Sequence, residues 1–167
     1  MDDPARCTVL GDIGGTHARF AWATPAGLEP VETLPVADYS GFDRALAAFL
    51  DRHRHGRPVS GAVFAVAGPV VANRGSMTNS GWIVDGAHLA KTFNLPSVRV
   101  VNDFEPLAWS LPALAPSDLL AIGAGRHAVN APAVVLGPGT GLGLACFVPR
   151  PDGAFVLDTE GGHATPA

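Results

Sequence analysis

An acidic residue stands beside a pair of glycines near the start of the chain, between two apolar stretches. Residues 8–10 (TVL) lead into residues 11–16 (GDIGGT), and residues 20–23 (FAWA) follow closely. This pattern predicts a β-hairpin in which glycine permits a positive φ and backbone N–H groups, with the Thr16 hydroxyl, bind phosphate. Asp12 would hold a hydrated Mg²⁺ beside that phosphate. The alternative is an ordinary glycine hairpin with a capping Asp.

A second glycine-rich turn lies between apolar stretches near the other end. Residues 133–136 (AVVL) precede residues 137–143 (GPGTGLG), and residues 144–148 (LACFV) follow. No Lys follows the glycines, which excludes a Walker loop, and a strand pattern follows them where a dinucleotide-binding fold has a helix. Two glycine–threonine hairpins favour two phosphate-binding turns that face each other across a cleft.

Asn102 and Asp103 follow the apolar residues 98–101, where a strand gives way to a helix. Ligands of open α/β sheets collect at the carboxyl ends of strands. A carboxylate there can accept the proton of a substrate hydroxyl while phosphate is transferred. The local pattern alone slightly favours the alternative, in which Asp103 is only the N-cap of the next helix.

Two further groups of polar residues suit a polyol. Glu160 and His163 flank two glycines and offer an acceptor and a switchable donor, although a polar turn is the alternative. Thr78 and Asn79 lie near Trp82, as polar groups beside an aromatic ring do in sugar sites. A single Trp is, however, more often part of a core.

Composition narrows the class of protein. The chain has 167 residues, of which 47% are hydrophobic, which suits one or two folded domains. Its net charge of −4 argues against nucleic acid as the main partner. The basic run 52–55 is interpreted as a solvated helix end. Cys7 and Cys146 lie beside or inside apolar strands, which indicates a reduced protein. No signal peptide or apolar run of transmembrane length is visible, so we expect a cytoplasmic location without membrane contact.

The order of elements predicts a mixed α/β fold. After the first hairpin we expect an edge strand at 31–36 that contains Pro35, a helix from a Ser40–Asp43 capping box to about Arg54, a buried parallel strand at 62–67, a loop or short hairpin at 73–82, a helix at 85–93, a strand at 98–101 and a helix with Pro106 in its first turn. Residues 112–132 are loop-rich. We therefore place one domain at 1–111 and the start of a second at 112–167. An uncovered sheet in the second would be costly, so we expect the N-terminal part of a longer protein or a truncated product.

Five strings match one family in order and approximate spacing. They are residues 11–16 (GDIGGT), 77–79 (MTN), 102–104 (NDF), 137–143 (GPGTGLG) and 160–163 (EGGH). From about Val9 to His163 the chain resembles bacterial ATP-dependent glucokinases. The resemblance implies the actin-like ATPase (ribonuclease H-like) fold, a mixed sheet with helices on both faces, and two domains that close over ATP and sugar.

The resemblance also implies the phosphorylation of D-glucose to glucose 6-phosphate with ATP in glycolysis, by a cytoplasmic enzyme whose full-length form can be a homodimer. Asp103 would be the general base. The implied site residues are Thr78, Asn79, Asn102, Asp103, Glu160 and His163 for glucose, Asp12, Gly14, Gly15, Thr16, Gly139, Thr140 and Gly141 for ATP, and Asp12 for Mg²⁺ through water.

Some features depart from the family pattern. Pro138 removes one N–H from the second glycine turn, and His17 stands where Asn is common. The family's further sugar-binding Glu, its adenosine-binding motif and its last helix have no counterpart in residues 1–167. The alternatives to a glucokinase are a catalytically silent sugar-binding or regulatory relative and a kinase for another hexose. A DNA-binding segment before the first hairpin, as in related repressors, is disfavoured because only eleven residues precede Asp12.

Overall fold

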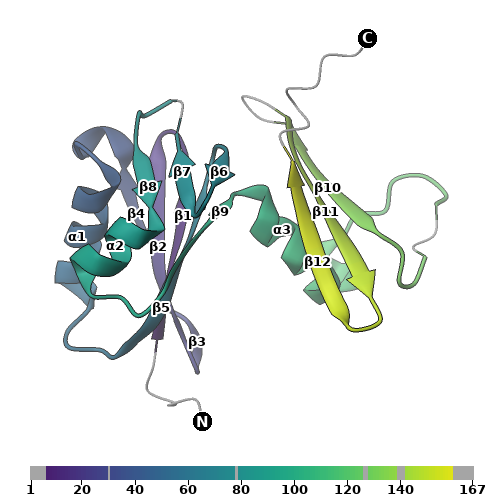
Figure 1. Cartoon of the computed structure of the whole chain (residues 1–167). Coiled ribbons are helices and arrows are strands. Elements are labelled where there is room, and N and C mark those ends of the chain that lie inside the picture. The colour runs from purple at the N-terminus through teal and green to yellow at the C-terminus, as the bar shows by residue number, and fades with distance from the viewer. Residues whose placement is uncertain (1–6, 30, 78, 126–127, 139–141, 160–167) are drawn as a thin grey trace. The chain divides into compact units, whose positions relative to one another are not determined.

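The structure is a computed structural model that describes residues 7–29, 31–77, 79–125, 128–138 and 142–159 (Figure 1). The chain forms two compact units that divide between Asp103 and Phe104. Each unit has its own sheet and at least one helix, so the predicted mixed α/β class is confirmed. None of the helices in the described ranges is long and apolar enough to cross a membrane.

The first unit is built on a six-stranded mixed sheet. Its strands run in the order β3-β2-β1-β5-β9, and β4 pairs with β2 beyond that path. Their bounds are β1 Cys7–Ile13, β2 His17–Thr24, β3 Gly27–Leu28, β4 Glu32–Pro35, β5 Val59–Val66 and β9 Val98–Asn102. β1 and β2 form the expected antiparallel hairpin, whereas β1, β5 and β9 are parallel. Pro35 lies on β4, which pairs only with β2 in the described residues, as an edge position requires.

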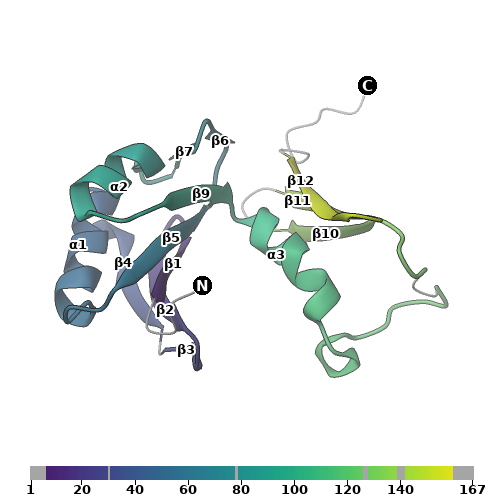
Figure 2. The same cartoon turned by 60° about the horizontal axis from the view of Figure 1, so that its bottom comes forward.

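Two helices cover one face of this sheet, as Figures 1 and 2 show. They are α1, Phe42–His53, and α2, Gly86–Phe93. Aromatic rings fill the space between α1 and the strands: the centroid of Phe42 lies 4.9 Å from that of Phe64, and Phe20 stacks 5.3 Å from Phe49. Coverage of the opposite face by helices stays a prediction.

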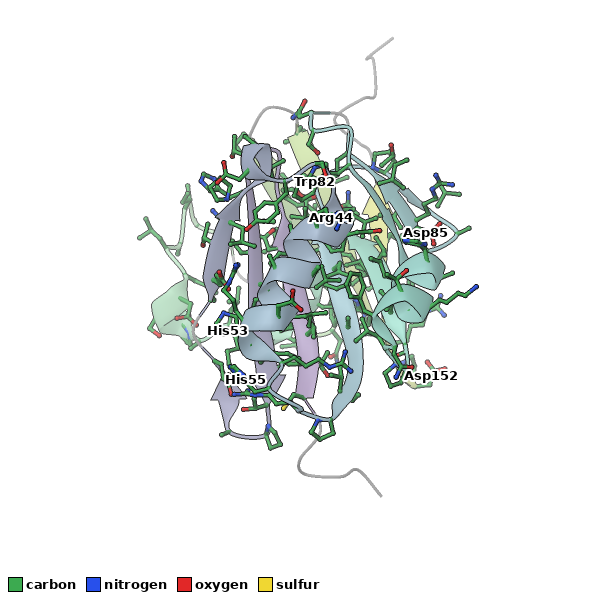
Figure 3. All side chains as sticks on the ribbon, turned by 90° about the vertical axis from the view of Figure 1, so that its left-hand side faces the viewer. Arg44, His53, His55, Trp82, Asp85 and Asp152 are labelled. Carbon is green, nitrogen blue, oxygen red and sulfur yellow. The ribbon has the colours of Figure 1, made fainter. Side chains whose placement is uncertain are left out.

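The start of α1 differs from the expected capping box, whereas its other end carries the expected exposed basic residues. Gly41 is the N-cap and makes no side-chain cap bond, whereas Asp43 contacts the His88 ring at 2.8 Å. The predicted cap is wrong because that tertiary contact engages the carboxylate. At the other end, where Figure 3 labels His53, Arg52 and His53 both contact Glu32 at 2.6 Å. The basic run is therefore partly neutralised.

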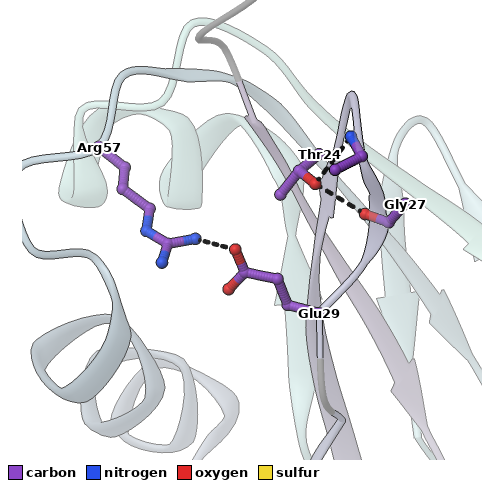
Figure 4. Close-up of polar contacts among 5 residues, drawn as sticks. Thr24, Gly27, Glu29 and Arg57 are labelled. Carbon is purple, nitrogen blue, oxygen red and sulfur yellow. Dashed lines mark hydrogen bonds and ion pairs between the residues drawn. The ribbon is translucent and has the colours of Figure 1, made fainter.

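A polar contact joins the β2–β3 region to the loop after α1 (Figure 4). Thr24 donates to the Gly27 carbonyl across a turn in which Gly27 has a φ of 122°, a conformation suited to glycine. Glu29 then accepts a hydrogen bond from Arg57, which raises the pKa of that guanidinium. Arg57 also lies 5.8 Å from the Trp22 ring, so it holds the loop against the sheet.

The segment between β5 and α2 forms a small antiparallel sheet, where a loop or short hairpin was expected. Its strands are β6 Val70–Val71, β7 Arg74–Ser76 and β8 Ile83–Asp85. Gly75 of β7 packs closely on the large sheet, since a Cβ there would lie 2.6 Å from a methyl of Val66. Asp85 then accepts from the His88 N–H and caps α2.

The second unit is a three-stranded antiparallel sheet with α3, Phe104–Ser110, on one face (Figure 2). Its strands are β10 Ala133–Pro138, β11 Leu142–Arg150 and β12 Gly153–Thr159. The sequence pattern grouped α3 with the N-terminal domain, but in this chain it packs on β10–β12. A domain boundary after residue 111 stays a prediction, and short 3₁₀ turns at 111–113 and 116–118 fit the loop-rich region expected there.

Two facing glycines allow α3 to reach this sheet. Gly137 and Gly143 lie opposite each other on β10 and β11, and the Phe104 ring rests on both. An added Cβ would lie 2.4 Å from that ring at Gly137 and 1.8 Å at Gly143. The outer glycines of the second glycine-rich turn are thus required by packing, whatever its centre binds.

We expect Gly143→Ala to destabilise the second unit by about 1–3 kcal/mol, because the new methyl group overlaps the Phe104 ring. Urea-dependent hydrogen exchange of residues 133–138 measures this unit separately. Gly125→Ala is the matched control, since a Cβ there meets no atom within 4 Å and its φ is not positive. Equal protection in the two variants would contradict the packing role.

Candidate active site

The carboxyl ends of β1, β5 and β9 meet at one edge of the six-stranded sheet. Parallel strands place their ends at the same edge, and hydrogen bonds join the residues that follow them. The Ala67 N–H donates to the Ile13 carbonyl at 3.0 Å, and the Asp103 N–H donates to the Val66 carbonyl at 3.0 Å. The first glycine turn and the Asn102–Asp103 pair therefore follow strands that end at the same side of the sheet.

The first glycine turn consists of residues 14–16 between β1 and β2. The Gly14 N–H donates to the His17 carbonyl at 2.9 Å, and the Thr16 carbonyl accepts from Val36 at 2.9 Å. Neither Gly14 nor Gly15 has a φ in the left-handed region, so the expected positive φ is wrong. Close approach explains Gly15, because a Cβ there would lie 3.3 Å from the side-chain nitrogen of Asn79.

Asn79 reaches the glycine turn from the connection between β7 and β8. The Met77 N–H donates to the Trp82 carbonyl at 2.9 Å, and the Gly81 N–H donates to Met77 at 3.0 Å. Met77 and Trp82 are buried, whereas Asn79 is exposed. The Trp82 ring lies 6.2 Å from that of Phe42, near the start of α1 in Figure 3, which confirms its reading as a core residue.

Asn102 is held rigidly at the end of β9. The residue is 8% exposed, and its side chain donates from Nδ2 to the Gly68 carbonyl at 3.2 Å. Gly68 packs against the backbone of Ser76. A Cβ added at Gly68 would lie only 2.5 Å from the Ser76 carbonyl oxygen, so a larger residue does not fit there. The neighbouring Asp103 is half-buried, with its backbone N–H bonded to Val66. This edge thus presents a carboxylate beside a fixed amide.

Asp12 is paired with a cation across the hairpin. It lies opposite Arg19 in the β1–β2 register, and the Arg19 guanidinium contacts its carboxylate at 3.0 Å. The side chains of Asp12 and Arg19 are 59% and 49% exposed, so water and ions can compete for the pair. In the described ranges, groups of three or more His, Cys, Asp or Glu suited to a metal are absent. One exposed carboxylate such as that of Asp12 still suits Mg²⁺, which often takes one or two protein carboxylates together with substrate phosphates.

Several predicted site residues lie outside the described residues. They are Thr78, Gly139, Thr140, Gly141, Glu160 and His163. Their assignments stay predictions. Among the described ones, the structure brings Gly14, Gly15 and Thr16 together with Asn79 at one turn. It places Asn102 and Asp103 at the end of β9, which is separated from β1 by β5. Sequence reasoning missed Gly68, whose Gly-Pro pair signalled only a strand end.

Comparisons with known proteins point to one family. A model of the family described as Glucokinase matches residues 9–167. The glucokinase of Paramagnetospirillum magneticum is 41% identical over 166 residues, which cover 98% of this chain and 51% of that protein. The glucokinase of Marinobacter nauticus is 38% identical over 158 residues, 93% of this chain and 49% of the relative. The chain thus spans about half the length of the curated relatives it matches.

Solved structures show the same fold. A glucokinase from an Antarctic psychrotroph superposes with a TM-score of 0.82 at 36% identity, over 96% of this chain and 52% of that one. A transcriptional regulator of the ROK family superposes with a TM-score of 0.62 at 18% identity, which shows a shared fold and nothing more. The actin-like ATPase fold of the sugar kinases is therefore confirmed.

We expect Gly15→Ala to displace the Asn79 side chain, because the added Cβ would lie 3.3 Å from its nitrogen. The Asn79 side-chain amide resonances in NMR spectra report this displacement. Gly14→Ala is the control in the same turn, since its Cβ meets only the His17 carbonyl at an ordinary 3.5 Å. Equal shifts of the Asn79 resonances in both variants would show that Asn79 does not rest on Gly15.

Proposed function

Because the chain belongs to the glucokinase family, we propose that the complete protein transfers the γ-phosphate of ATP to the 6-hydroxyl of D-glucose. The observation that carries this proposal is the position of Asp103, at the carboxyl end of a parallel strand beside the fixed amide of Asn102. Such strand ends are where open α/β sheets bind ligands. The family gives ATP as the co-substrate.

Asp103 would accept the proton of the sugar 6-hydroxyl as that oxygen attacks the γ-phosphorus and the bond to the departing ADP breaks. Asn102 would donate to or accept from a second hydroxyl without moving, since its amide is already anchored on Gly68. Asn79 would contact the sugar from the connection between β7 and β8. We assign Thr78, Glu160 and His163 to the sugar on the family pattern.

Residues of the two glycine turns would hold the phosphates. Gly14, Gly15 and Thr16 offer backbone N–H groups and a hydroxyl at the sheet edge, and we assign Gly139, Thr140 and Gly141 to the same task by family pattern. Asp12 would hold a hydrated Mg²⁺, which supplies positive charge to the phosphates when bound. Asp12 would then exchange its contact with Arg19 for one with a hydrated ion.

We infer a cytoplasmic enzyme of glycolysis whose partners are glucose and ATP, without nucleic acid or membrane. The net charge of −4 argues against nucleic acid as a partner. Cys7 is buried among apolar residues of the core, which suits a reduced compartment. A homodimer of the complete protein is compatible with the family. A coupled assay for ADP with glucose, mannose and fructose tests the substrate, and turnover restricted to another hexose would overturn it.

In the complete protein, Asp103→Asn should lower kcat by about 10²–10⁴-fold, because the amide keeps the shape of the side chain but cannot take the proton. Glucose affinity, measured by calorimetry, should change much less. Asn is as good an N-cap as Asp, so the substitution separates catalysis from capping.

Asp51→Asn is the control for that experiment, since it makes the same chemical change at an exposed position of α1. It should leave kcat unaltered. Near-normal turnover of Asp103→Asn would mean that Asp103 serves only the helix start.

Residues 1–167 alone should show little or no turnover of glucose. The chain covers about half the length of these two curated relatives. Phosphoryl transfer requires that both substrates are oriented and shielded from water, which needs the remaining half of the enzyme as well. The same coupled assay, with a full-length glucokinase as positive control, measures this. Turnover within about tenfold of that control, a barrier difference of only ~1.4 kcal/mol, would show that the remaining half is dispensable.

A further inference from the structure

The outer edge of β9 is covered by one side chain. In the part of the chain that the structure describes, β9 ends the strand path of the six-stranded sheet, so its main-chain groups that point away from β5 have no partner strand there. The Asn73 side chain takes that place: its Nδ2 donates to the Val98 carbonyl at 2.9 Å, and its Oδ1 accepts from the Val100 N–H at 2.7 Å. One amide therefore imitates the peptide group of a missing neighbour strand.

Asn73 occupies a turn position at which glycine would serve the backbone better. Residues 72 and 73 join β6 to β7, and Ala72 and Asn73 have φ values of 49° and 62°. Two-residue hairpin turns of this type favour Gly, Asn or Asp because other side chains are strained there. Asn therefore suits the turn, and its side chain also makes two hydrogen bonds to β9 that glycine could not make.

The same residue also contacts the start of α2, and β7 begins directly after it. Its backbone carbonyl accepts from the Gly86 N–H at the start of α2, at 3.0 Å. Two residues further along the chain, Gly75 packs on Val66 and Val100. A Cβ added at Gly75 would lie 2.6 Å from a methyl of Val66 and 3.3 Å from a methyl of Val100. β7 then leads to the turn that presents Asn79, while β9 leads to Asn102. Asn73 therefore sets the position of one proposed sugar contact relative to another.

We propose that Asn73 is a positioning residue for the sugar site: it clamps the β6–β7 hairpin to β9 and so holds Asn79 at a fixed distance from Asn102 and Asp103. This inference rests on the proposed function for its ligand, glucose, and on the hydrogen bonds alone for the clamp. Asn73 itself touches no substrate.

Asn73→Gly in the complete protein tests the clamp, because glycine keeps the left-handed turn and removes both side-chain bonds. Deuterium uptake by a peptide that spans residues 98–102 should rise as the Val100 N–H loses its acceptor. The glucose Kd, measured by calorimetry without nucleotide, should rise about tenfold, while the Kd of a non-hydrolysable ATP analogue should stay within about twofold. A residue that serves the turn alone would give neutral or increased stability and unchanged binding.

Asn94→Gly is the matched control. Asn94 also has a positive φ, 49°, at the C-cap of α2, and its side chain makes no hydrogen bond in the described part of the chain. Asn94→Gly should leave the deuterium uptake of residues 98–102 and the glucose Kd unaltered. Should Asn73→Gly fail to fold, Asn73→Asp decides: it keeps an acceptor for Val100 but sets an oxygen against the Val98 carbonyl, so glucose binding should weaken in the same way.

Three results would overturn the proposal. Unchanged uptake at residues 98–102 in Asn73→Gly would remove the clamp. Raised uptake with unchanged glucose affinity would remove the positioning role. Equal losses for glucose and the ATP analogue would indicate a general structural role. Absence of glucose binding by the unaltered protein would instead refute the proposed function, and the uptake measurement would still judge the clamp.

Discussion

The parallel pairing of β1, β5 and β9 is the constraint on which the site depends. Register along these strands fixes where each one ends, and the bonds from Ala67 to Ile13 and from Asp103 to Val66 carry that register beyond the strands. A slip of β9 by one residue would move each of its side chains, including that of Asn102, to the other face of the sheet, and it would displace Asp103 as well. The apolar side chains of β5, buried on the helix-bearing face against α1, make such a slip costly.

Close backbone approaches then bring the second layer to this edge. Gly75 lets β7 lie on Val66, Gly68 lets the chain pass the Ser76 carbonyl, and Gly15 leaves room for Asn79. In each case the glycine provides space and needs no unusual φ. The site is therefore assembled from ordinary strands that can come unusually near one another.

Much of this arrangement follows from the sequence, and the exceptions have physical reasons. The hairpin around residues 14–16, the buried strand predicted at 62–67 and the helix predicted at 85–93 were found because local patterns determine them. The α1 cap was predicted wrongly because Asp43 contacts His88, 45 residues away, which no local pattern reveals. The Asn73 clamp and the Phe104 contact with Gly137 and Gly143 were invisible for the same reason. The sequence did place Asn102 and Asp103 correctly at a strand end, but their anchoring through Gly68 and Val66 is tertiary.

The proposed function requires that Asp103 faces the sugar hydroxyl that receives phosphate. A crystal structure of the complete protein with glucose tests it most directly. We expect a carboxylate oxygen of Asp103 about 2.6–3.2 Å from the glucose 6-hydroxyl, with Asn102 still bonded to Gly68. Glucose bound away from the carboxyl ends of β5 and β9, or with its 6-hydroxyl directed away from Asp103, would contradict it.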